Sequence, residues 1–188
     1  MLLSMAAFFV SVMTYAQGDG LAVAERLVRA MRTDKSAIKG TLVAYLKKPD
    51  AAGTVELTDG QRRDFLRCLE ETDTPLIVHA LANVLVRQLS LAEMEEALVF
   101  YNSSAGRQQV EREQGEVQRM LGYELAKVSP AMSGRGKVSL DRFRRTSAYA
   151  KLQEFPAQVN ATRETRMEIY QDSQLAAAAC SRTVGLAR

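Results

Sequence analysis

Glutamates are the side chains in this sequence that come closest to a catalytic pattern. Seven of them fall between residues 93 and 124: Glu93, Glu95, Glu96, Glu111, Glu113, Glu116 and Glu124. Two carboxyl groups that face each other across a cleft, one with a raised pKa, can hydrolyse a glycosidic bond. However, Arg107, Arg112 and Arg119 are interleaved with these acids, and that spacing is typical of solvated helix faces with ion pairs. A hydrolase is therefore the alternative interpretation and not the leading one.

The other residue types that usually carry catalysis are scarce. His79 is the only histidine, and the sequence places no second metal ligand within helical reach of it. The chain has no Gly-x-Ser-x-Gly elbow to work with His79 and no glycine-rich loop to hold a phosphate. We therefore expect His79 to be a partly buried polar residue, and we predict no catalytic residue, no metal site and no cofactor.

Charge is distributed unevenly along the chain, although the formal net charge is only +3. Residues 93–124 hold seven acids and three arginines, whereas residues 127–151 hold seven bases and one aspartate. Arg142, Arg144 and Arg145 are candidate contacts for an anionic partner, such as an acidic polymer or an anionic lipid surface. The alternative is that the basic stretch packs against the acidic stretch of its own chain. The small net charge disfavours nucleic acid as the partner.

The first sixteen residues, MLLSMAAFFVSVMTYA, contain no charged side chain. An apolar stretch of this length that ends in small residues predicts a secretory signal peptide cleaved near Ala16. Ser4, Ser11 and Thr14 make it a poor membrane span, and a retained anchor or a buried first helix are the alternatives. The predicted mature chain begins near Gln17 and occupies an oxidising compartment, either the periplasm or the cell exterior.

Export gives a meaning to Cys68 and Cys180, which are the only cysteines in the chain. An even number of cysteines in an exported protein favours a disulfide. This bridge would close a loop of more than 100 residues, and in the chain-entropy model it would contribute about 4–5 kcal/mol to stability. The alternative is two buried thiols, because Cys68 lies beside Phe65 and Leu69 on an apolar helix face.

Apolar residues recur every three or four positions along most of the chain, and no alternating β pattern of convincing length is present. We therefore predict an all-α fold: a single helical bundle of about six to seven helices that occupies residues 17–188 and has a central helical hairpin. Thr74 and Pro75 are expected to cap and begin one of these helices. Residues 129–137 are predicted to be a flexible connection. The helix that follows this connection is expected to break near Pro156.

A corner between two helices is expected at residues 90–107, SLAEMEEALVFYNSSAGR. The residues expected to build it are Ser90, Glu93, Phe100, Tyr101, Ser103 and Gly106. Ser90 and Glu93 match a capping box, and the two aromatic rings can bury a large area at the helix end. Gly106 allows the two backbones to approach closely. We interpret the corner as a structural element, and a ligand contact is the alternative.

The corner also resembles the bacterial domain-of-unknown-function 2059 family. In that family an acidic and an aliphatic residue precede Phe-Tyr, a Ser or Thr, usually a proline, and then a glycine and a basic residue. The same order is found here between Glu93 and Arg107, with Ser104 where the family usually has proline. The resemblance covers residues 74–128, under a third of the chain. It implies a helical protein of the bacterial periplasm, and it implies no activity.

These observations favour a non-enzymatic exported helical protein that binds a partner or takes part in an assembly of the cell envelope. The partner would be an anionic envelope surface or another protein. The alternative is a hydrolase of envelope polymers that uses the carboxylates of the hairpin. The two hypotheses differ in one observable: a hydrolase needs two partly buried acids in a shared cleft, whereas exposed glutamates argue against it.

Overall fold

The computed structural model of this chain describes residues 19–46, 58–120 and 131–185. In these ranges the protein is all-α, with nine helical segments and no strand. A helix at residues 19–31 is followed by α2 (Thr33–Leu46), α3 (Asp59–Glu71), α4 (Pro75–Gln88), α5 (Leu91–Tyr101), α6 (Ser104–Met120), α7 (Gly134–Phe143), α8 (Ser147–Ala161) and α9 (Arg163–Thr183). The all-α prediction is confirmed. The predicted signal peptide at residues 1–16 lies outside the described residues.

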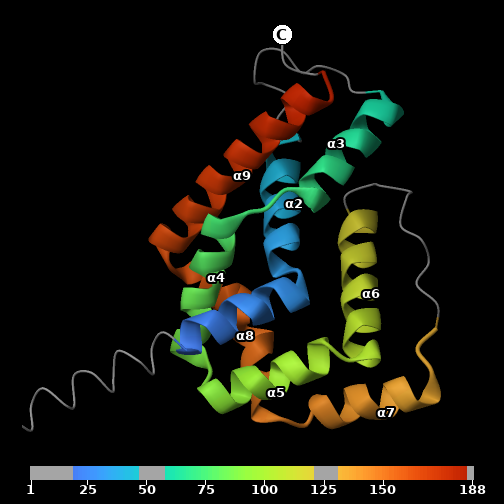
Figure 1. Ribbon diagram of the computed structural model, residues 1–188, viewed down its shortest axis with the longest axis vertical. Helices are drawn as coiled ribbons and strands as arrows, with labels where there is room; N and C mark the ends of the chain where they lie inside the picture. Colours follow the sequence, from blue (N-terminus) through green and yellow to red (C-terminus); the bar gives the residue numbers. More distant parts are fainter. Residues whose placement is uncertain (1–18, 47–57, 121–130, 186–188) are drawn as a thin grey trace, which may run out of the picture.

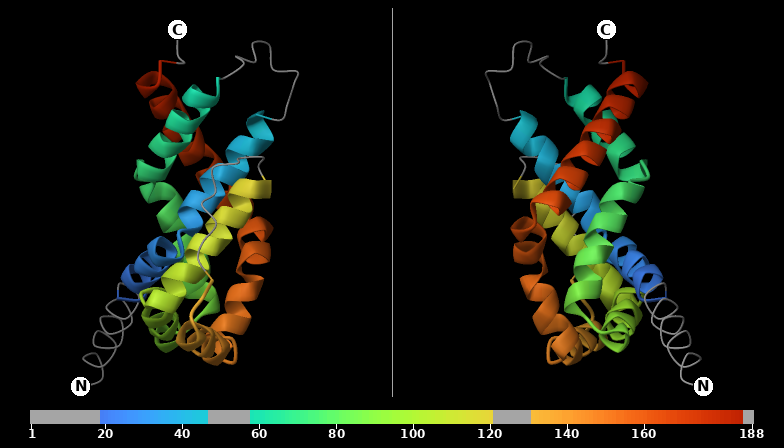
Figure 2. Two further views of the ribbon diagram at one scale, coloured as in Figure 1. Left: turned by 90° about the vertical axis from the view of Figure 1, so that its right-hand side faces the viewer. Right: turned by 90° about the vertical axis from the view of Figure 1, so that its left-hand side faces the viewer.

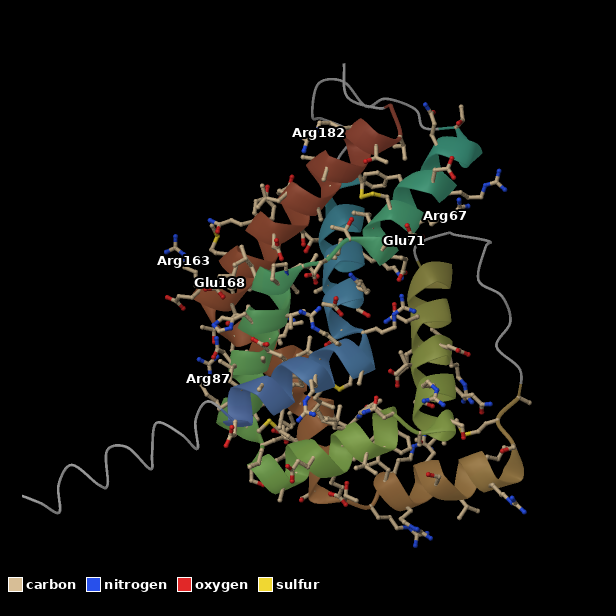
Figure 3. All side chains as sticks on the ribbon, in the orientation of Figure 1. Arg67, Glu71, Arg87, Arg163, Glu168 and Arg182 are labelled. Carbon is tan, nitrogen blue, oxygen red and sulfur yellow. A yellow bond between two sulfur atoms is a disulfide. The ribbon has the colours of Figure 1, made fainter. Side chains whose placement is uncertain are left out.

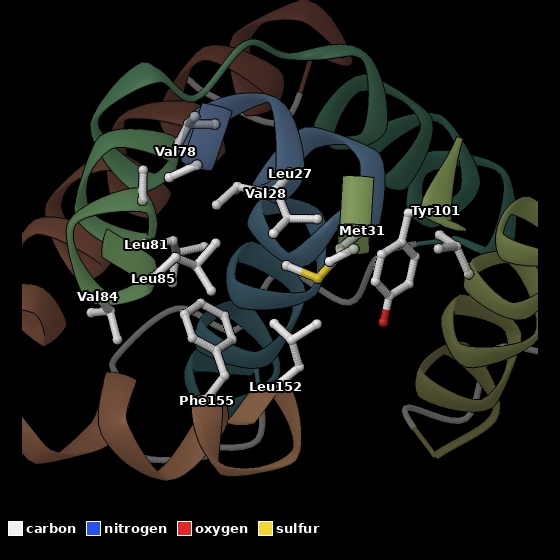
Figure 4. Packing of buried hydrophobic residues seen from close by; sticks show 14 of the residues in the cluster. Leu27, Val28, Met31, Val78, Leu81, Val84, Leu85, Tyr101, Leu152 and Phe155 are labelled. Atoms are coloured by element: carbon white, nitrogen blue, oxygen red, sulfur yellow. The ribbon is translucent and has the colours of Figure 1, made fainter. Parts of the chain in front are cut away.

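The centre of the molecule is an apolar layer between the helix at residues 19–31, α4 and α8. Figure 4 shows side chains from these three helices packed together: Leu27, Val28, Met31, Val78, Leu81, Val84, Leu85, Leu152 and Phe155. Helical spacing of these residues places them on the inner side of each helix, where their burial stabilises the fold. Apart from Ala80, the buried hydrophobic residues of the described chain form one continuous cluster, which is the core of a single bundle.

The remaining helices surround this layer (Figures 1 and 2). α9 packs against α2, α3 and α4 at the upper end of Figure 1. α5 and α7 follow one another along the lower end, and α6 rises along one side of the molecule. The helices therefore build two different ends, one at α3 and α9 and the other at α5 and α7.

The expected hairpin is a corner at the edge of the bundle and is not central. α5 runs along the lower end, whereas α6 runs up the side (Figure 1). Only Asn102 and Ser103 separate the two helices. A connection of two residues keeps the first turn of α6 against the last turn of α5, so the chain turns a corner there instead of folding α6 back along α5.

The helix count exceeds the predicted six to seven, in part because residues 131–161 divide into two helices. Arg32 has a left-handed φ of 54° and ends the first helix before α2. Residues 131–161 form both α7 and α8, which are separated by residues 144–146. Part of the predicted flexible connection is therefore helical. Ser133 caps α7 by accepting a hydrogen bond from the backbone N–H of Gly136 at 3.1 Å.

Pro156 does not break its helix as expected. α8 continues past it to Ala161. Leu152 and Phe155 are buried before the proline, and Val159 packs against the core after it. Apolar packing on both sides thus keeps the chain helical, even though a proline removes one backbone hydrogen bond.

Candidate functional site

Glu93 is held by hydrogen bonds from two helices. At the N-terminus of α5 it forms the expected capping box with Ser90, whose N–H donates to Oε2 at 2.8 Å. From α8, the Ser147 hydroxyl donates to Oε1 at 2.9 Å and Lys151 Nζ donates to Oε2 at 2.7 Å. Lys151, followed by the serine groups, lowers the pKa of Glu93 to about 2. Glu93 is thus an ionised group that fastens α5 to α8.

Glu113 lies on α6 in different surroundings. Its Oε1 accepts a hydrogen bond from Gln109 Nε2 at 2.7 Å, one turn away on the same helix. Although part of the side chain is exposed, crowding by protein atoms removes water from the carboxyl group and raises its pKa. The hydrogen-bond partners of Glu93 come from α5 and α8, whereas that of Glu113 comes from α6. The two acids with opposite pKa shifts therefore share no hydrogen-bond partner.

The other glutamates of this stretch that the structure describes point to solvent: Glu95, Glu96, Glu111 and Glu116. Glu124 lies outside the described residues. Arg107 and Arg112 form no ion pair with these acids in the described part of the chain, and the side chain of Arg119 lies outside it. Arg107 instead donates to the Asn102 carbonyl at 2.5 Å. A carbonyl at the end of α5 lacks a helical partner, so the Arg107 side chain satisfies it.

The corner residues make close packing contacts. The Phe100 ring stacks on Phe143 of α7 with centroids 4.2 Å apart, and Tyr101 meets Phe143 edge-on at 5.7 Å. Ser103 Oγ accepts the N–H of Gly106 at 3.1 Å. A Cβ at Gly106 would lie 2.1 Å from the Phe100 carbonyl oxygen, so only glycine fits there. The corner joins three helices through these contacts, as expected of a structural element.

His79 is more exposed than the sequence suggested. Its side chain is 52% exposed on α4, and Nδ1 lies 3.3 Å from Oε1 of Glu25. Glu25 belongs to the helix at residues 19–31, so its approach to His79 depends on the packing of that helix against α4. In the ranges that the structure covers, no group of three His, Cys, Asp or Glu residues is placed to hold a metal ion.

Cys68 and Cys180 form a disulfide, with the sulfur atoms 2.00 Å apart and the Cα atoms 5.7 Å apart. The bond joins α3 to the last turns of α9 across 112 residues of sequence (Figure 3). Cys180 is fully buried, whereas Cys68 is half-buried and lines a groove of about 550 Å³ between the two helices. The disulfide fits an oxidising compartment.

A buried polar cluster that the sequence did not suggest connects α2, α3 and α6. Lys39 on α2 is only 4% exposed, pairs with Glu70 of α3, and donates to Gln114 Oε1 of α6 at 3.1 Å. Gln114 Nε2 in turn donates to Ser36 Oγ at 2.7 Å. The partners of Lys39 lie 31 and 75 residues away in the chain, so no local pattern could have revealed the cluster. Its polar groups satisfy one another and serve packing.

A polar groove of about 410 Å³ between α4 and α8 was also missed. Its lining includes Arg87, Gln88, Lys151, Glu154 and Gln158. Lys151 is already paired with Glu93, which leaves Arg87 as the cation that faces a ligand there. The two walls come from residues that are more than sixty positions apart, and each reads as an ordinary solvated helix face in the sequence.

The three candidate arginines of the basic stretch remain on the surface. Arg142, Arg144 and Arg145 are all exposed, and the partner of Arg144 is Asp141 of its own helix, at 3.8 Å. Lys151 is the basic residue that pairs with the acidic stretch. The expectation that the basic stretch packs against the acidic one therefore holds at Lys151. Among the residues that the structure describes, the side chains of Arg142 and Arg145 form no ion pair, whereas Arg144 pairs with Asp141.

Comparison with family models, with curated proteins and with solved structures found no match. The resemblance of residues 74–128 to the 2059 family remains a prediction. In the described ranges, no helix combines the length and the apolar composition needed to cross a membrane.

Proposed function

We propose that this is an exported, non-enzymatic helical protein that acts by binding another protein in the cell envelope. The observation that carries the proposal is the exposed basic end of α7, where Arg142 and Arg145, which lies two residues after the helix, form no ion pair with any residue that the structure describes. Exposed charges of one sign attract a partner of the opposite sign and orient it. The disulfide supports a location outside the reducing cytoplasm.

The hydrolase hypothesis receives less support. Glu93 has a strongly lowered pKa and is fully engaged by Ser147, Lys151 and its own cap. A general acid needs a raised pKa and a second carboxylate opposite it. Glu113 has the raised pKa, but its hydrogen-bond partner is Gln109 on the same helix.

Two measurements on the native host test the proposal. Mass spectrometry of the purified protein should show an N-terminus near Gln17, and cell fractionation should place it in the envelope. An intact Met1 in the soluble cytoplasmic fraction would refute export. Purified protein incubated with isolated cell-wall polymer should release no fragments, and release that is abolished by Glu113→Gln would establish the hydrolase instead.

The binding role is tested by cross-linking in intact cells. The double variant Arg142→Gln/Arg145→Gln should lose the cross-linked products of the wild type. The control Arg163→Gln/Arg182→Gln changes two exposed arginines of α9, at the far side of the molecule (Figure 3), and should keep them. Equal loss in both double variants would show that α7 has no special role.

A further inference from the structure

α5 and α7 present opposite charges at the same end of the molecule. In Figure 1 the two helices follow one another along the lower end of the molecule, and their C-terminal ends meet at the Phe100–Phe143 stack. Because their buried residues point into the bundle above them, their exposed sides together cover this end. We call this surface the α5–α7 face. It consists of Glu95, Glu96 and Val99 of α5 with Val138, Arg142 and Arg145 of α7 and the residues directly after it.

Each helix of the α5–α7 face shows a valine beside charges. Val99 is 74% exposed, and Glu95 and Glu96 lie one helical turn before it, on the same side of α5. Val138 is 62% exposed, and Arg142 lies one turn after it on the outer side of α7. An exposed branched apolar side chain gains free energy when a partner covers it.

A uniformly anionic partner fits this face poorly. A lipid surface or an acidic polymer would be attracted by Arg142 and Arg145 but repelled by Glu95 and Glu96. Glu95 and Glu96 lie only five and four residues before Phe100, and Arg142 directly precedes Phe143. At about 1.5 Å per residue the acids are about 6–8 Å along α5 from the point where the two helices meet, which is comparable to the Debye length at physiological ionic strength. Both rows of charge therefore act on the same partner, and the partner that fits must carry its own acidic and basic rows.

We propose that a second copy of this chain is that partner, bound face to face through the α5–α7 face. In a two-fold symmetric dimer, a contact from one copy to the other is always repeated in reverse. When Glu95 and Glu96 of one copy meet Arg142 and Arg145 of the other, the two-fold axis also brings the glutamates of the second copy to the arginines of the first. Val99 and Val138 then lie within the covered area. This inference rests on the proposed binding function and names its partner.

The dimer is expected to be weak. α5 and α7 have 11 and 10 residues, so at about 1.5 Å per residue each spans only about 15–16 Å. A face of this size covers less than the roughly 800 Å² per partner of a standard interface. We therefore expect a concentration-dependent equilibrium that favours monomer at micromolar concentration and dimer toward millimolar concentration.

Sedimentation velocity on the purified, disulfide-bonded protein provides the first test. Between about 10 and 500 µM at low salt, the weight-average sedimentation coefficient should rise toward that of a dimer. At about 1 M salt, where the Debye length is about 3 Å, the rise should be strongly reduced. A constant monomer value over the whole range at low salt would overturn the proposal. Co-sedimentation of that monomer with anionic vesicles would then identify a membrane as the partner.

Charge reversal provides the second and sharper test. Glu95→Arg/Glu96→Arg makes both rows basic, and Arg142→Glu/Arg145→Glu makes both rows acidic. Each variant alone should lose self-association, because equal charges then meet in both halves of the dimer. An equimolar mixture should restore it, since every contact between the two different variants is again complementary. Failure of the mixture to associate would overturn the proposed arrangement, even if each variant alone is monomeric.

Matched reversals on α9 serve as controls. Glu164→Arg/Glu168→Arg and Arg163→Glu/Arg182→Glu change the same numbers of exposed charges far from the α5–α7 face and should self-associate like the wild type. Circular dichroism must show unchanged helix content in every variant. The pure-protein assay separates this inference from the proposed function: a monomer that is still exported and cross-linked in the envelope through Arg142 and Arg145 refutes the dimer alone.

Discussion

The two ends of the bundle are held together by different physical means. At the end built by α3 and α9, a covalent bond between Cys68 and Cys180 joins residues 112 positions apart. The end built by α5, α6 and α7 has no cross-link. Its helices are joined by aromatic packing, in which Phe143 stacks on Phe100 and meets Tyr101 edge-on. The comparison shows that aromatic packing stabilises one end in any redox state, whereas the other end depends on its compartment.

Of the changes considered at the two ends, removal of the disulfide should lower the free energy of unfolding the most. Cys68→Ala/Cys180→Ala frees a loop of over 100 residues, for which the chain-entropy model gives a loss of about 4–5 kcal/mol in unfolding free energy. Urea denaturation with and without a reducing agent measures it. The wild type should fall to the stability of the variant on reduction, and the variant should not respond to the reducing agent. Equal stability of oxidised and reduced wild type would contradict the account.

The aromatic end is tested by Phe100→Ala. The ring is 6% exposed and stacks on Phe143, so its removal should cost about 3–5 kcal/mol in unfolding free energy. Val99→Ala is the matched control, because Val99 is next to Phe100 but 74% exposed. This change should stay within about 0.5 kcal/mol. The cost of Phe100→Ala should be the same in the oxidised and the reduced protein, because the two ends are independent. A redox-dependent cost would show that they are coupled.

Gly106→Ala probes the same end through the backbone. The new methyl group would collide with the Phe100 carbonyl and the Tyr101 Cα, and relief of this overpacking should cost about 1–3 kcal/mol or more. Gly134→Ala is the control, because nothing lies within 4 Å of the added methyl group at the start of α7. Thermal denaturation should show a clear drop for the first variant and none for the second. A neutral Gly106→Ala would mean that the corner has room to open.

The smallest effect is expected at Glu93, as a pH dependence. Its pKa falls from an ordinary 4.5 to about 2 in the folded protein, so its contribution to stability is complete above pH 4.5 and disappears as the pH falls toward 2. Glu93→Gln should therefore be less stable than the wild type at neutral pH and converge with it near pH 2. Glu95→Gln, an exposed neighbour, should follow the wild-type curve. Denaturation midpoints measured from pH 2 to 7 give the comparison, and parallel curves for Glu93→Gln and the wild type would contradict it.

Much of the fold was accessible from local sequence signals. Capping boxes at Thr58 and Ser90, the helical spacing of apolar residues and the need for glycine at position 106 each involve groups within a few residues of one another. Such signals act in any helical context, which is why the all-α class was predicted. The continuation of α8 past Pro156 was not predicted, because apolar packing on both sides of the proline overrides its local preference.

The candidate sites show the same division. The sequence predicts that Thr74 caps α4, but the Thr74 side chain accepts no hydrogen bond from this helix. Asp172 of α9 instead accepts the N–H of Ile77 at 3.1 Å. Only the docking of α9 brings this carboxylate to the start of α4. The Thr74 hydroxyl is left to donate to Asp34 of α2 at 3.3 Å.

The sequence by itself determined that this chain is helical, that its two cysteines suit a disulfide, and that its charges segregate into an acidic and a basic stretch. Tertiary structure alone decided that Lys151 pairs with Glu93 and that Lys39 is buried among Glu70 and Gln114. The reason is physical. A helix propagates through hydrogen bonds four residues apart, so it is specified locally, whereas a side-chain partner dozens of residues away is chosen by how whole helices bury their apolar sides.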